Sequence, residues 1–309
     1  MQTAVFQHES FLRHDTGDGH PERPERMTAL RHVLDTESFA LLDRIDAPAG
    51  TESQILAVHP EHHLRRIEEA IPESGYAMIT GDTIVCPESM TAALHAVGAA
   101  CAAVDGVAGG TLRNAFCAAR PPGHHAESAR AMGFCLFSNA AIAARHAIDA
   151  HGMSRVAVVD FDVHHGNGTQ EIAWNRPDMF YASTHQEHIF PGTGRLDERG
   201  AHDNIVNAPL PMGSGGDAML DAFDTTILPA LDAFRPDLII VSAGFDAHRL
   251  DPLAGLAWTE DDFETVTRRI VAAADRLCHS RLVSVLEGGY HLDALAHSAA
   301  RHLRVLMEA

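Results

Sequence analysis

The chain of 309 residues is long enough for one large α/β domain or for two ordinary ones. Its formal net charge of -19 excludes a general nucleic-acid-binding protein, which needs a basic surface, and suits cationic substrates such as lysine-containing peptides or polyamines. No apolar run approaches the ~20 residues that span a bilayer, and no export signal is visible, so we expect a cytoplasmic protein that binds no membrane.

Short apolar segments alternate along the chain with segments of helical spacing. The predicted strands are Thr3–Gln7, Ala115–Ala119, Val156–Phe161, Met179–Thr184, Leu238–Ala243 and Leu282–Leu286. The predicted helices are Pro24–Asp35, Pro60–Ala70, Glu88–Ala108, Ser138–His151, Ala218–Phe234, Glu260–Cys278 and Leu292–Met307. This alternation predicts a single α/β domain over residues 1–309, with a central, mostly parallel sheet and helices on both faces. The segment Ile189–Asn207 reads as a long loop that could form a pocket.

Polar motifs follow five of the six predicted strands directly. They are Arg120–His125, Asp160–Gly168, His185, Gly244–Asp246 and Glu287–Tyr290. The carboxyl ends of parallel strands meet at one edge of a sheet, which is where ligand sites form in this class of fold. We therefore expect these motifs to build one site.

The segment around Asp162 and His164 has the composition of half a metal site. On an extended chain the two side chains point to the same face, and Asp246 supplies a third ligand from another strand end. Three protein ligands with an open position are typical of a catalytic metal site, and nitrogen and oxygen ligands without thiolate suit Zn²⁺, Fe²⁺ or Co²⁺. The alternatives are a polar loop after a strand and, for Asp246, a helix cap.

The adjacent His124 and His125 follow Pro-Pro-Gly, which makes a rigid turn. A histidine with a pKa near ~6.5 can accept a proton from water and return it to a leaving amine. Asp160 and Asn167 are candidates for the partners that orient the two imidazoles. Two surface histidines in a turn are the alternative.

Three aromatic residues lie in loops where they can contribute to a pocket. Tyr290 follows two glycines and can donate a hydrogen bond to an oxyanion, although a buried structural tyrosine is the alternative. Phe134 and Phe190 can wall a narrow apolar channel, or simply pack. Among five dispersed cysteines without a C-x-x-C pair, Cys135 stands beside Phe134, but dispersed cysteines are typical of reduced, buried thiols.

In this order the motifs resemble the histone deacetylase superfamily, which includes bacterial histone-deacetylase-like amidohydrolases, acetylpolyamine amidohydrolases and acetoin utilisation proteins. Asn167 and the Glu-Gly-Gly-Tyr ending at Tyr290 resemble its class II branch, and the similarity runs from about residue 20 to about residue 290. Ser138 stands where relatives often have asparagine, and no basic tail or partner-binding domain is evident, which weakens any specific histone assignment.

The resemblance implies the arginase/deacetylase fold and a defined set of site residues. One Zn²⁺ per chain is implied on Asp162, His164 and Asp246. The implied catalytic residues are His124, His125, Tyr290, Asp160 and Asn167. A structural K⁺ is implied at Asp160, Asp162, His164, Ser183 and Thr184. Substrate-binding positions are implied at Gly133, Phe134, Phe190, Leu253 and Arg26, the last near an internal cavity below the metal.

We therefore expect a zinc amidohydrolase that removes acetyl or other short acyl groups from acetyl-lysine-type amines, in peptides or small molecules. His125 is the expected general base and later acid, with His124 as its electrostatic partner. The alternatives are an acetylpolyamine amidohydrolase, a non-catalytic acyl-lysine or metabolite binder and an arginase-like enzyme with two Mn²⁺ ions. A homo-oligomer is possible, and no nucleic-acid partner is expected.

Overall fold

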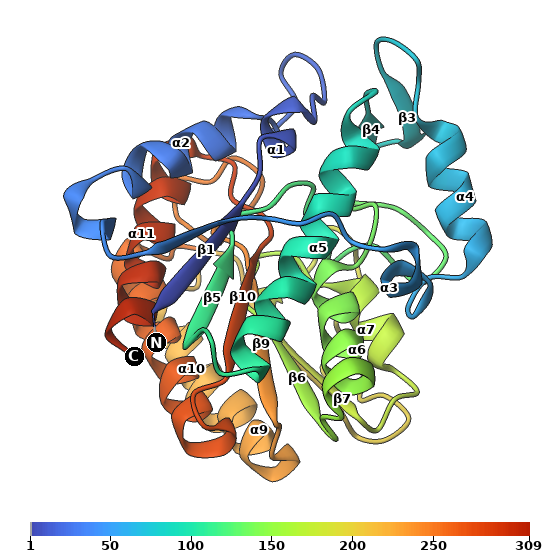
Figure 1. The fold of residues 1–309 in the computed structure, drawn as a ribbon. Coiled ribbons are helices and arrows are strands. Elements are labelled where there is room, and N and C mark those ends of the chain that lie inside the picture. The colour runs from blue at the N-terminus through green and yellow to red at the C-terminus, as the bar shows by residue number, and fades with distance from the viewer. Residues whose placement is uncertain (1) are drawn as a thin grey trace.

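A parallel sheet of eight strands forms the centre of the molecule in the computed structural model, which describes residues 2–309 (Figure 1). The strand order is β2-β1-β5-β10-β9-β6-β7-β8, and every neighbouring pair is parallel. The strands are β1 (Thr3–Gln7), β2 (Asp43–Asp46), β5 (Asn114–Cys117), β6 (Val156–Asp160), β7 (Met179–Gln186), β8 (Ile205–Leu210), β9 (Leu238–Ala243) and β10 (Leu282–Leu286). A separate antiparallel hairpin joins β3 (Ala77–Thr80) to β4 (Thr83–Val85).

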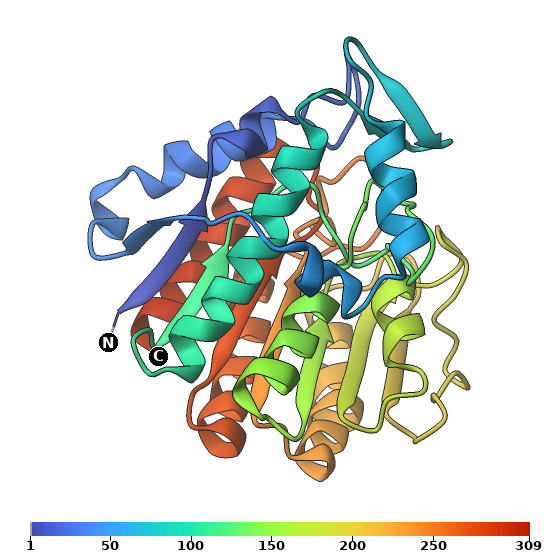
Figure 2. The same ribbon diagram turned by 45° about the vertical axis from the view of Figure 1, so that its right-hand side comes forward.

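Helices cover both faces of the sheet, as Figures 1 and 2 show from two directions. One face carries α5 (Ser89–Ala108) and α6 (Asn139–His151), and the other carries α10 (Glu260–Cys278) and α11 (Leu292–Glu308), with α2 (Glu25–Leu34) packed on α11. The remaining helices are α1 (Ser10–Arg13), α3 (Glu52–Leu56), α4 (Glu61–Ala70), α7 (Asn167–Ala173), α8 (Gly216–Ala222) and α9 (Leu228–Phe234), with a 3-10 turn at Glu37–Phe39 and a π-helical turn at Phe223–Ile227.

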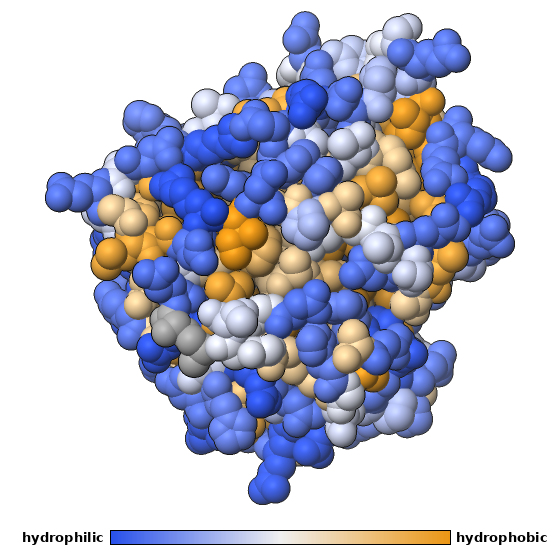
Figure 3. All heavy atoms as spheres, viewed as in Figure 1, coloured by the Kyte–Doolittle hydropathy of each residue, from blue (hydrophilic) through white to orange (hydrophobic). Residues whose placement is uncertain are grey.

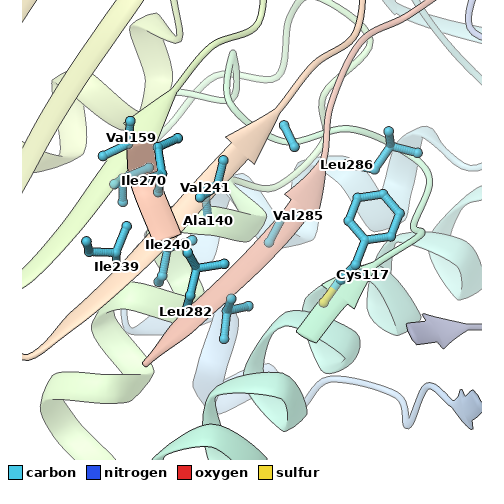
Figure 4. Packing of buried hydrophobic residues seen from close by; sticks show 14 of the residues in the cluster. Cys117, Ala140, Val159, Ile239, Ile240, Val241, Ile270, Leu282, Val285 and Leu286 are labelled. Carbon is cyan, nitrogen blue, oxygen red and sulfur yellow. The ribbon is translucent and has the colours of Figure 1, made fainter. Parts of the chain in front are cut away.

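The core of the molecule lies on both faces of the central strands. Strands β6, β9 and β10 are buried along their whole length, because each is covered by a helical layer on either side. Side chains such as Ile239, Val241 and Val285 fill the space between the layers (Figure 4). Each fully buried aliphatic side chain of this kind contributes about 1.5–3 kcal/mol.

The predicted elements are found, with differences at their ends and at the edges of the sheet. The loop predicted at Ile189–Asn207 is wrong at its end, because Ile205 begins the edge strand β8. That strand carries Pro209, which is tolerated only where one side of a strand has no partner. The predicted helix Ala218–Phe234 contains the π-helical turn between α8 and α9. Strand β2 was not predicted, because its sequence Asp-Arg-Ile-Asp is mostly charged and exposed.

Helix α5 is long and apolar enough to cross a membrane by its length and composition alone. It has 20 residues and is the one such helix in residues 2–309. Yet 61% of its most apolar stretch is buried inside the molecule, where α5 packs on α6 and on the sheet. Figure 3 shows the face of the molecule on which α5 lies. Polar residues cover most of this face, and apolar residues lie near its centre, over α5. Helix α5 is therefore built into the core.

A glycine in α5 allows the chain to cross the helix closely. The segment after β2 passes over Gly98, and the N–H of Gly50 donates a hydrogen bond of 2.7 Å to the carbonyl oxygen of Leu94. A Cβ atom at Gly98 would overlap the carbonyl oxygen of Pro48 and lie 2.6 Å from the nitrogen of Gly50. These obstacles are backbone atoms, so they cannot rotate away.

We predict that Gly98→Ala lowers the free energy of unfolding by about 2 kcal/mol because of this overlap. At a helix position with free space, the same exchange would stabilise the protein by about 1 kcal/mol. Urea unfolding followed by circular dichroism measures the difference. Gly81→Ala is the matched control, since a Cβ atom there meets nothing within 4 Å. A Gly98→Ala protein as stable as the wild type would contradict the close crossing.

Candidate active site

The polar motifs gather at the carboxyl-end edge of the parallel sheet. Strands β5, β6, β9 and β10 are neighbours in the order β5-β10-β9-β6, so the segments that follow them meet. The structure brings together all of the residues predicted as metal ligands and the tandem histidines, with Tyr290 beside them.

Asp162, His164 and Asp246 are buried and converge on one point. His164 Nδ1 lies 3.2 Å from Asp162 Oδ1 and 3.1 Å from Asp246 Oδ2. The extended-strand argument for the first two residues is wrong in detail, because β6 ends at Asp160 and the following segment is irregular. Backbone N–H groups hold the ligands instead: that of His164 donates to Asp162 Oδ1, and that of Val163 donates to Asp246 Oδ1.

Two glycines leave the space that these carboxylates occupy. A Cβ atom at Gly244 would overlap the carboxylate of Asp162, and one at Gly288 would overlap Asp246 Oδ2 and lie 2.6 Å from Asp162 Oδ2. The N–H of Gly288 also donates a hydrogen bond of 2.8 Å to Asp162 Oδ2. Glycine is thus required at both positions for the close approach of the strand ends.

The charges of this cluster fit a bound cation. Burial alone would lower the pKa of His164, but its contacts with Asp162 and Asp246 raise it to about 10. Burial and the charge of Asp162 raise the pKa of Asp246. Buried carboxylates this close are costly unless a cation offsets their charge. One nitrogen and two oxygen donors suit Zn²⁺, and also Fe²⁺ or Co²⁺, and a zinc ion there would act as a Lewis acid toward an amide carbonyl.

The positions at which the sequence suggested looking for ligands of a second, arginase-like metal are occupied by apolar side chains. Phe245 and Ala247, on either side of Asp246, are apolar and buried. Among the described residues at this edge of the sheet, Asp162, His164 and Asp246 are the group whose ligand atoms all lie within 4.8 Å of one another.

The tandem histidines lie next to the ligand cluster, with their ring centroids 4.0 Å apart. His124 Nδ1 lies 3.0 Å from Asp160 Oδ2, and His125 Nδ1 lies 2.9 Å from Asn167 Oδ1. The amide nitrogen of Asn167 donates to Glu127 at 2.9 Å, which turns its oxygen toward His125. His125 Nδ1 is then the donor, and its Nε2 is left to accept a proton.

Their surroundings give the two histidines opposite charge states. Burial alone would lower the pKa of His124, but the carboxylates of Asp162, Asp160 and Glu287 raise it well above the ordinary histidine value. Burial, together with the positive charge of His124, lowers the pKa of His125 well below that value. The contacts of the two rings therefore favour the charged form of His124 and the neutral form of His125.

Tyr290 lies on the other side of the pocket, between Phe134 and Arg26. Its ring meets that of Phe134 edge-on at 5.8 Å, and the guanidinium carbon of Arg26 lies 5.2 Å from its centroid. Burial and the charge of Asp246 raise the pKa of Tyr290 well above its ordinary value, so its hydroxyl remains a hydrogen-bond donor. Its backbone N–H donates a hydrogen bond of 2.7 Å to Asp251.

Arg26 is buried behind Tyr290. Its guanidinium donates to the carbonyl oxygens of Gly289 and Glu287 and to the carboxylate of Glu22. The carboxylate of Glu22 also pairs with the buried Arg120. Arg26 therefore contacts the ring of Tyr290 and the backbone carbonyl of the preceding residue, Gly289.

Three of the residues predicted to bind substrate, Phe190, Leu253 and Gly133, differ in exposure and in their contacts with the tandem histidines. The ring of Phe190 packs edge-on against His125 at 5.0 Å and remains 42% exposed, and Leu253 is 39% exposed. Gly133 has a φ of 57°, and a Cβ atom there would lie 2.7 Å from Cγ of His125, so only glycine lets the loop with Phe134 pack on that ring. Cys135 next to it is buried, and burial raises the pKa of its thiol well above its ordinary value, which makes it a poor nucleophile.

The residues predicted to bind potassium lie around the end of β6. Ser183 is the register partner of Asp160 across β6 and β7, and Thr184 follows it. The hydroxyl oxygen of Thr184 is buried and, within residues 2–309, has no hydrogen-bond partner. An unpaired buried hydroxyl oxygen is one donor that a hard cation with oxygen ligands can use.

Sequence reasoning did not find three residues that hold the site together. Asp251 binds the N–H groups of Tyr290 and Leu253, but no motif surrounds it. Tyr181 donates to Asp160 from the middle of β7. Glu287 stood within a predicted motif without a role, and its carboxylate accepts the N–H groups of Gly123 and His124 at 2.7 and 3.1 Å. Only the tertiary contacts reveal these functions.

Comparison with known proteins shows which family has this arrangement. The family model of the histone deacetylase domain matches residues 20–306. The chain belongs to the histone deacetylase family. It is 43% identical over 277 residues to the histone deacetylase-like amidohydrolase of Pseudomonas aeruginosa, covering 88% of this chain and 73% of that protein. It is 38% identical to chloroplastic histone deacetylase 14 of Arabidopsis thaliana, covering 94% of this chain and 73% of that protein.

A solved structure confirms the fold. The crystal structure of the HDA15 HD domain superimposes with a TM-score of 0.93 at 36% identity, covering 99% of this chain and 90% of that chain. The predicted fold, an α/β domain of the arginase/deacetylase type, is therefore confirmed, as is a hydrolytic deacetylase of the histone deacetylase family.

We predict that Asp251→Asn in this deacetylase lowers kcat about tenfold to a hundredfold, because the loss of a carboxylate oxygen loosens the backbone of Tyr290. KM on an acetyl-lysine substrate should change little. The measurement is a double-mutant cycle with Tyr290→Phe. Once the hydroxyl of Tyr290 is gone, Asp251→Asn should have little further effect. An equal loss in both backgrounds would show that Asp251 does not act through Tyr290.

Proposed function

We propose that this deacetylase binds one Zn²⁺ through Asp162, His164 and Asp246 and hydrolyses acetyl or other short acyl groups on the amines of acetyl-lysine-type substrates. The observation that supports the proposal most directly is a buried ligand cluster beside two histidines, one hydrogen-bonded to the carboxylate of Asp160 and the other to the amide of Asn167. A zinc ion would polarise the amide carbonyl and lower the pKa of nearby water.

The protein side chains transfer protons and stabilise the charge that develops on the substrate. His125 Nε2 accepts a proton from the attacking water and later returns it to the leaving amine. His124, held by Asp160, contributes positive charge as negative charge develops on the substrate oxygen. The hydroxyl of Tyr290 donates a hydrogen bond to that oxygen, and Asn167 sets the tautomer of His125.

Phe134, Phe190, Leu253 and Gly133 form the substrate entrance in this proposal, with Arg26 behind Tyr290. The edge-on packing of Phe190 on His125 and of Phe134 on Tyr290 supports two apolar walls beside the reacting groups. Such walls suit the aliphatic stem of an acylated lysine or polyamine, whose length brings the amide to the base of the pocket. The unpaired hydroxyl of Thr184 supports the structural K⁺ of the proposal. A cytoplasmic location and a homo-oligomer stay predictions.

Metal removal and Tyr290→Phe test the two halves of the proposal. Chelation should abolish hydrolysis of a fluorogenic acetyl-lysine substrate, and Zn²⁺ should restore it. Asp162→Ala should lose both activity and bound zinc in metal analysis. Tyr290→Phe should keep the zinc and lower kcat about 10²- to 10³-fold. Tyr76→Phe is the matched control, because Tyr76 is 55% exposed and outside the ligand cluster. Equal activities of Tyr290→Phe and wild type would refute the assigned role of the tyrosine.

An acetylpolyamine is the second candidate substrate, favoured by one observation. Asp82 is partly exposed and accepts the backbone N–H of Gly133, beside the Phe134 wall. A carboxylate at that position can attract a second ammonium group of a polyamine.

Rates on acetylspermidine, acetylputrescine and an acetyl-lysine peptide will separate the two substrates. We expect the peptide to have the highest kcat/KM. A polyamine preference of tenfold or more that Asp82→Asn abolishes would assign the enzyme to polyamines. Binding of all three without turnover at full zinc occupancy would instead indicate a non-catalytic binder.

A further inference from the structure

A second group of metal-ligating side chains lies outside the active site. Residues 2–309 contain two groups of three or more His, Cys, Asp or Glu residues whose ligand atoms all lie within 4.8 Å of one another. One is the cluster of Asp162, and the other consists of Asp105, His146 and His151. The second group plays no part in the proposed deacetylation.

The three side chains come from two helices that pack side by side (Figures 1 and 2). Asp105 lies in the last turns of α5, and the two histidines lie near the end of α6, where Gly152 with a φ of 65° terminates the helix directly after His151. The ends of both helices lead into the beginnings of β5 and β6. The group therefore lies at the amino-end edge of the sheet, opposite the active site.

The geometry directs two nitrogens at one oxygen. Nε2 of His146 and Nε2 of His151 each lie 2.7 Å from Oδ1 of Asp105, and the two rings meet edge-on with centroids 5.7 Å apart. The side chains of the two histidines are only 16% and 26% exposed, whereas that of Asp105 is 53% exposed. Two imidazoles are thus held in place by the helix packing, with an open side toward solvent.

A metal ion needs little rearrangement of this group. Metal–ligand bonds of about 2.0–2.1 Å in a tetrahedral site place the ligand atoms about 3.3 Å apart, so each imidazole nitrogen would move about 0.6 Å from the oxygen. The contacts with His151 and His146 outweigh burial and lower the pKa of Asp105, which keeps it an anionic ligand. Two imidazole nitrogens and one carboxylate favour Zn²⁺, Cu²⁺, Ni²⁺ or Co²⁺ over Ca²⁺ or Mg²⁺.

We infer that Asp105, His146 and His151 form a second site for a divalent transition metal, which joins the ends of α5 and α6. Water fills the remaining position, because the open side of the group faces solvent. The bound ion links two helices of one layer and stabilises the folded chain by mass action. The site does not depend on the catalytic metal, since it lies at the opposite edge of the sheet.

The test separates this site from the catalytic one. Asp162→Ala protein, stripped by chelator and titrated with Zn²⁺ in a calorimeter, should bind one equivalent. Adding His146→Gln and His151→Gln should remove that equivalent or weaken its affinity at least 100-fold. The matched control adds His62→Gln, which changes one exposed helical histidine on α4, and should bind like Asp162→Ala alone.

Of two further measurements, the first covers the case in which Asp162→Ala fails to fold, and the second applies where it folds. Stripped and reloaded wild type should contain two equivalents of zinc, and His146→Gln/His151→Gln should contain one and keep its deacetylase activity. Zn²⁺ at 100 times the dissociation constant of the second site should raise the Tm of chelator-treated Asp162→Ala by about 4 °C and leave the triple variant unchanged.

Equal stoichiometry in wild type and His146→Gln/His151→Gln would overturn the inference, as would loss of the same equivalent in the His62→Gln control. The first result would leave the group as hydrogen-bonded histidines around a carboxylate, and the second would indicate unspecific binding to histidines. Failure of the zinc deacetylase proposal would appear separately. In that case the wild type would be inactive, but His146→Gln/His151→Gln would still contain one equivalent of zinc less than the wild type.

Discussion

Two buried carboxylates, Asp162 and Asp246, face the same nitrogen of His164, and the rest of the site depends on this arrangement. Holding like charges so close in the interior is unfavourable unless backbone N–H groups and a cation offset them. The N–H groups come from His164, Val163 and Gly288. Strand ends can approach this closely only because Gly244 and Gly288 have no side chains.

The same carboxylate charge determines how the neighbouring histidines differ. Nδ1 of His124 is hydrogen-bonded to the carboxylate of Asp160, whereas Nδ1 of His125 is hydrogen-bonded to the neutral amide of Asn167. The pKa of one imidazole is therefore raised and that of the other lowered, although they are adjacent in the chain. Tyr181 and Glu287 hold this arrangement from behind, the first through Asp160 and the second through the backbone of His124. The electrostatic difference between the two histidines thus originates in residues that never reach the substrate.

The parallel sheet separates the two metal-ligating groups of the chain. Every strand runs in the same direction, so all carboxyl ends lie at the active-site edge and all helix ends that precede β5 and β6 lie at the other. The irregular loops at the first edge bring ligands from several strands, whereas the regular ends of α5 and α6 bring together Asp105 and two histidines. The two groups consequently differ in burial: one is closed inside the protein and the other is partly open to solvent.

The sequence by itself determined the central strands and the main helices, and it predicted the motifs that the structure brings together at one edge of the sheet. Buried parallel strands are continuous apolar runs, and the polar residues at their ends stand out against them. It did not reveal the charged edge strand β2 or the strand β8 with its proline, because edge strands lack that signal. Only the tertiary structure decided the different hydrogen-bond partners of His124 and His125, the hydrogen bond from the backbone of Tyr290 to Asp251 and the convergence of Asp105 with His146 and His151. These properties arise from burial and from contacts between residues far apart in the chain, and local sequence patterns contain neither.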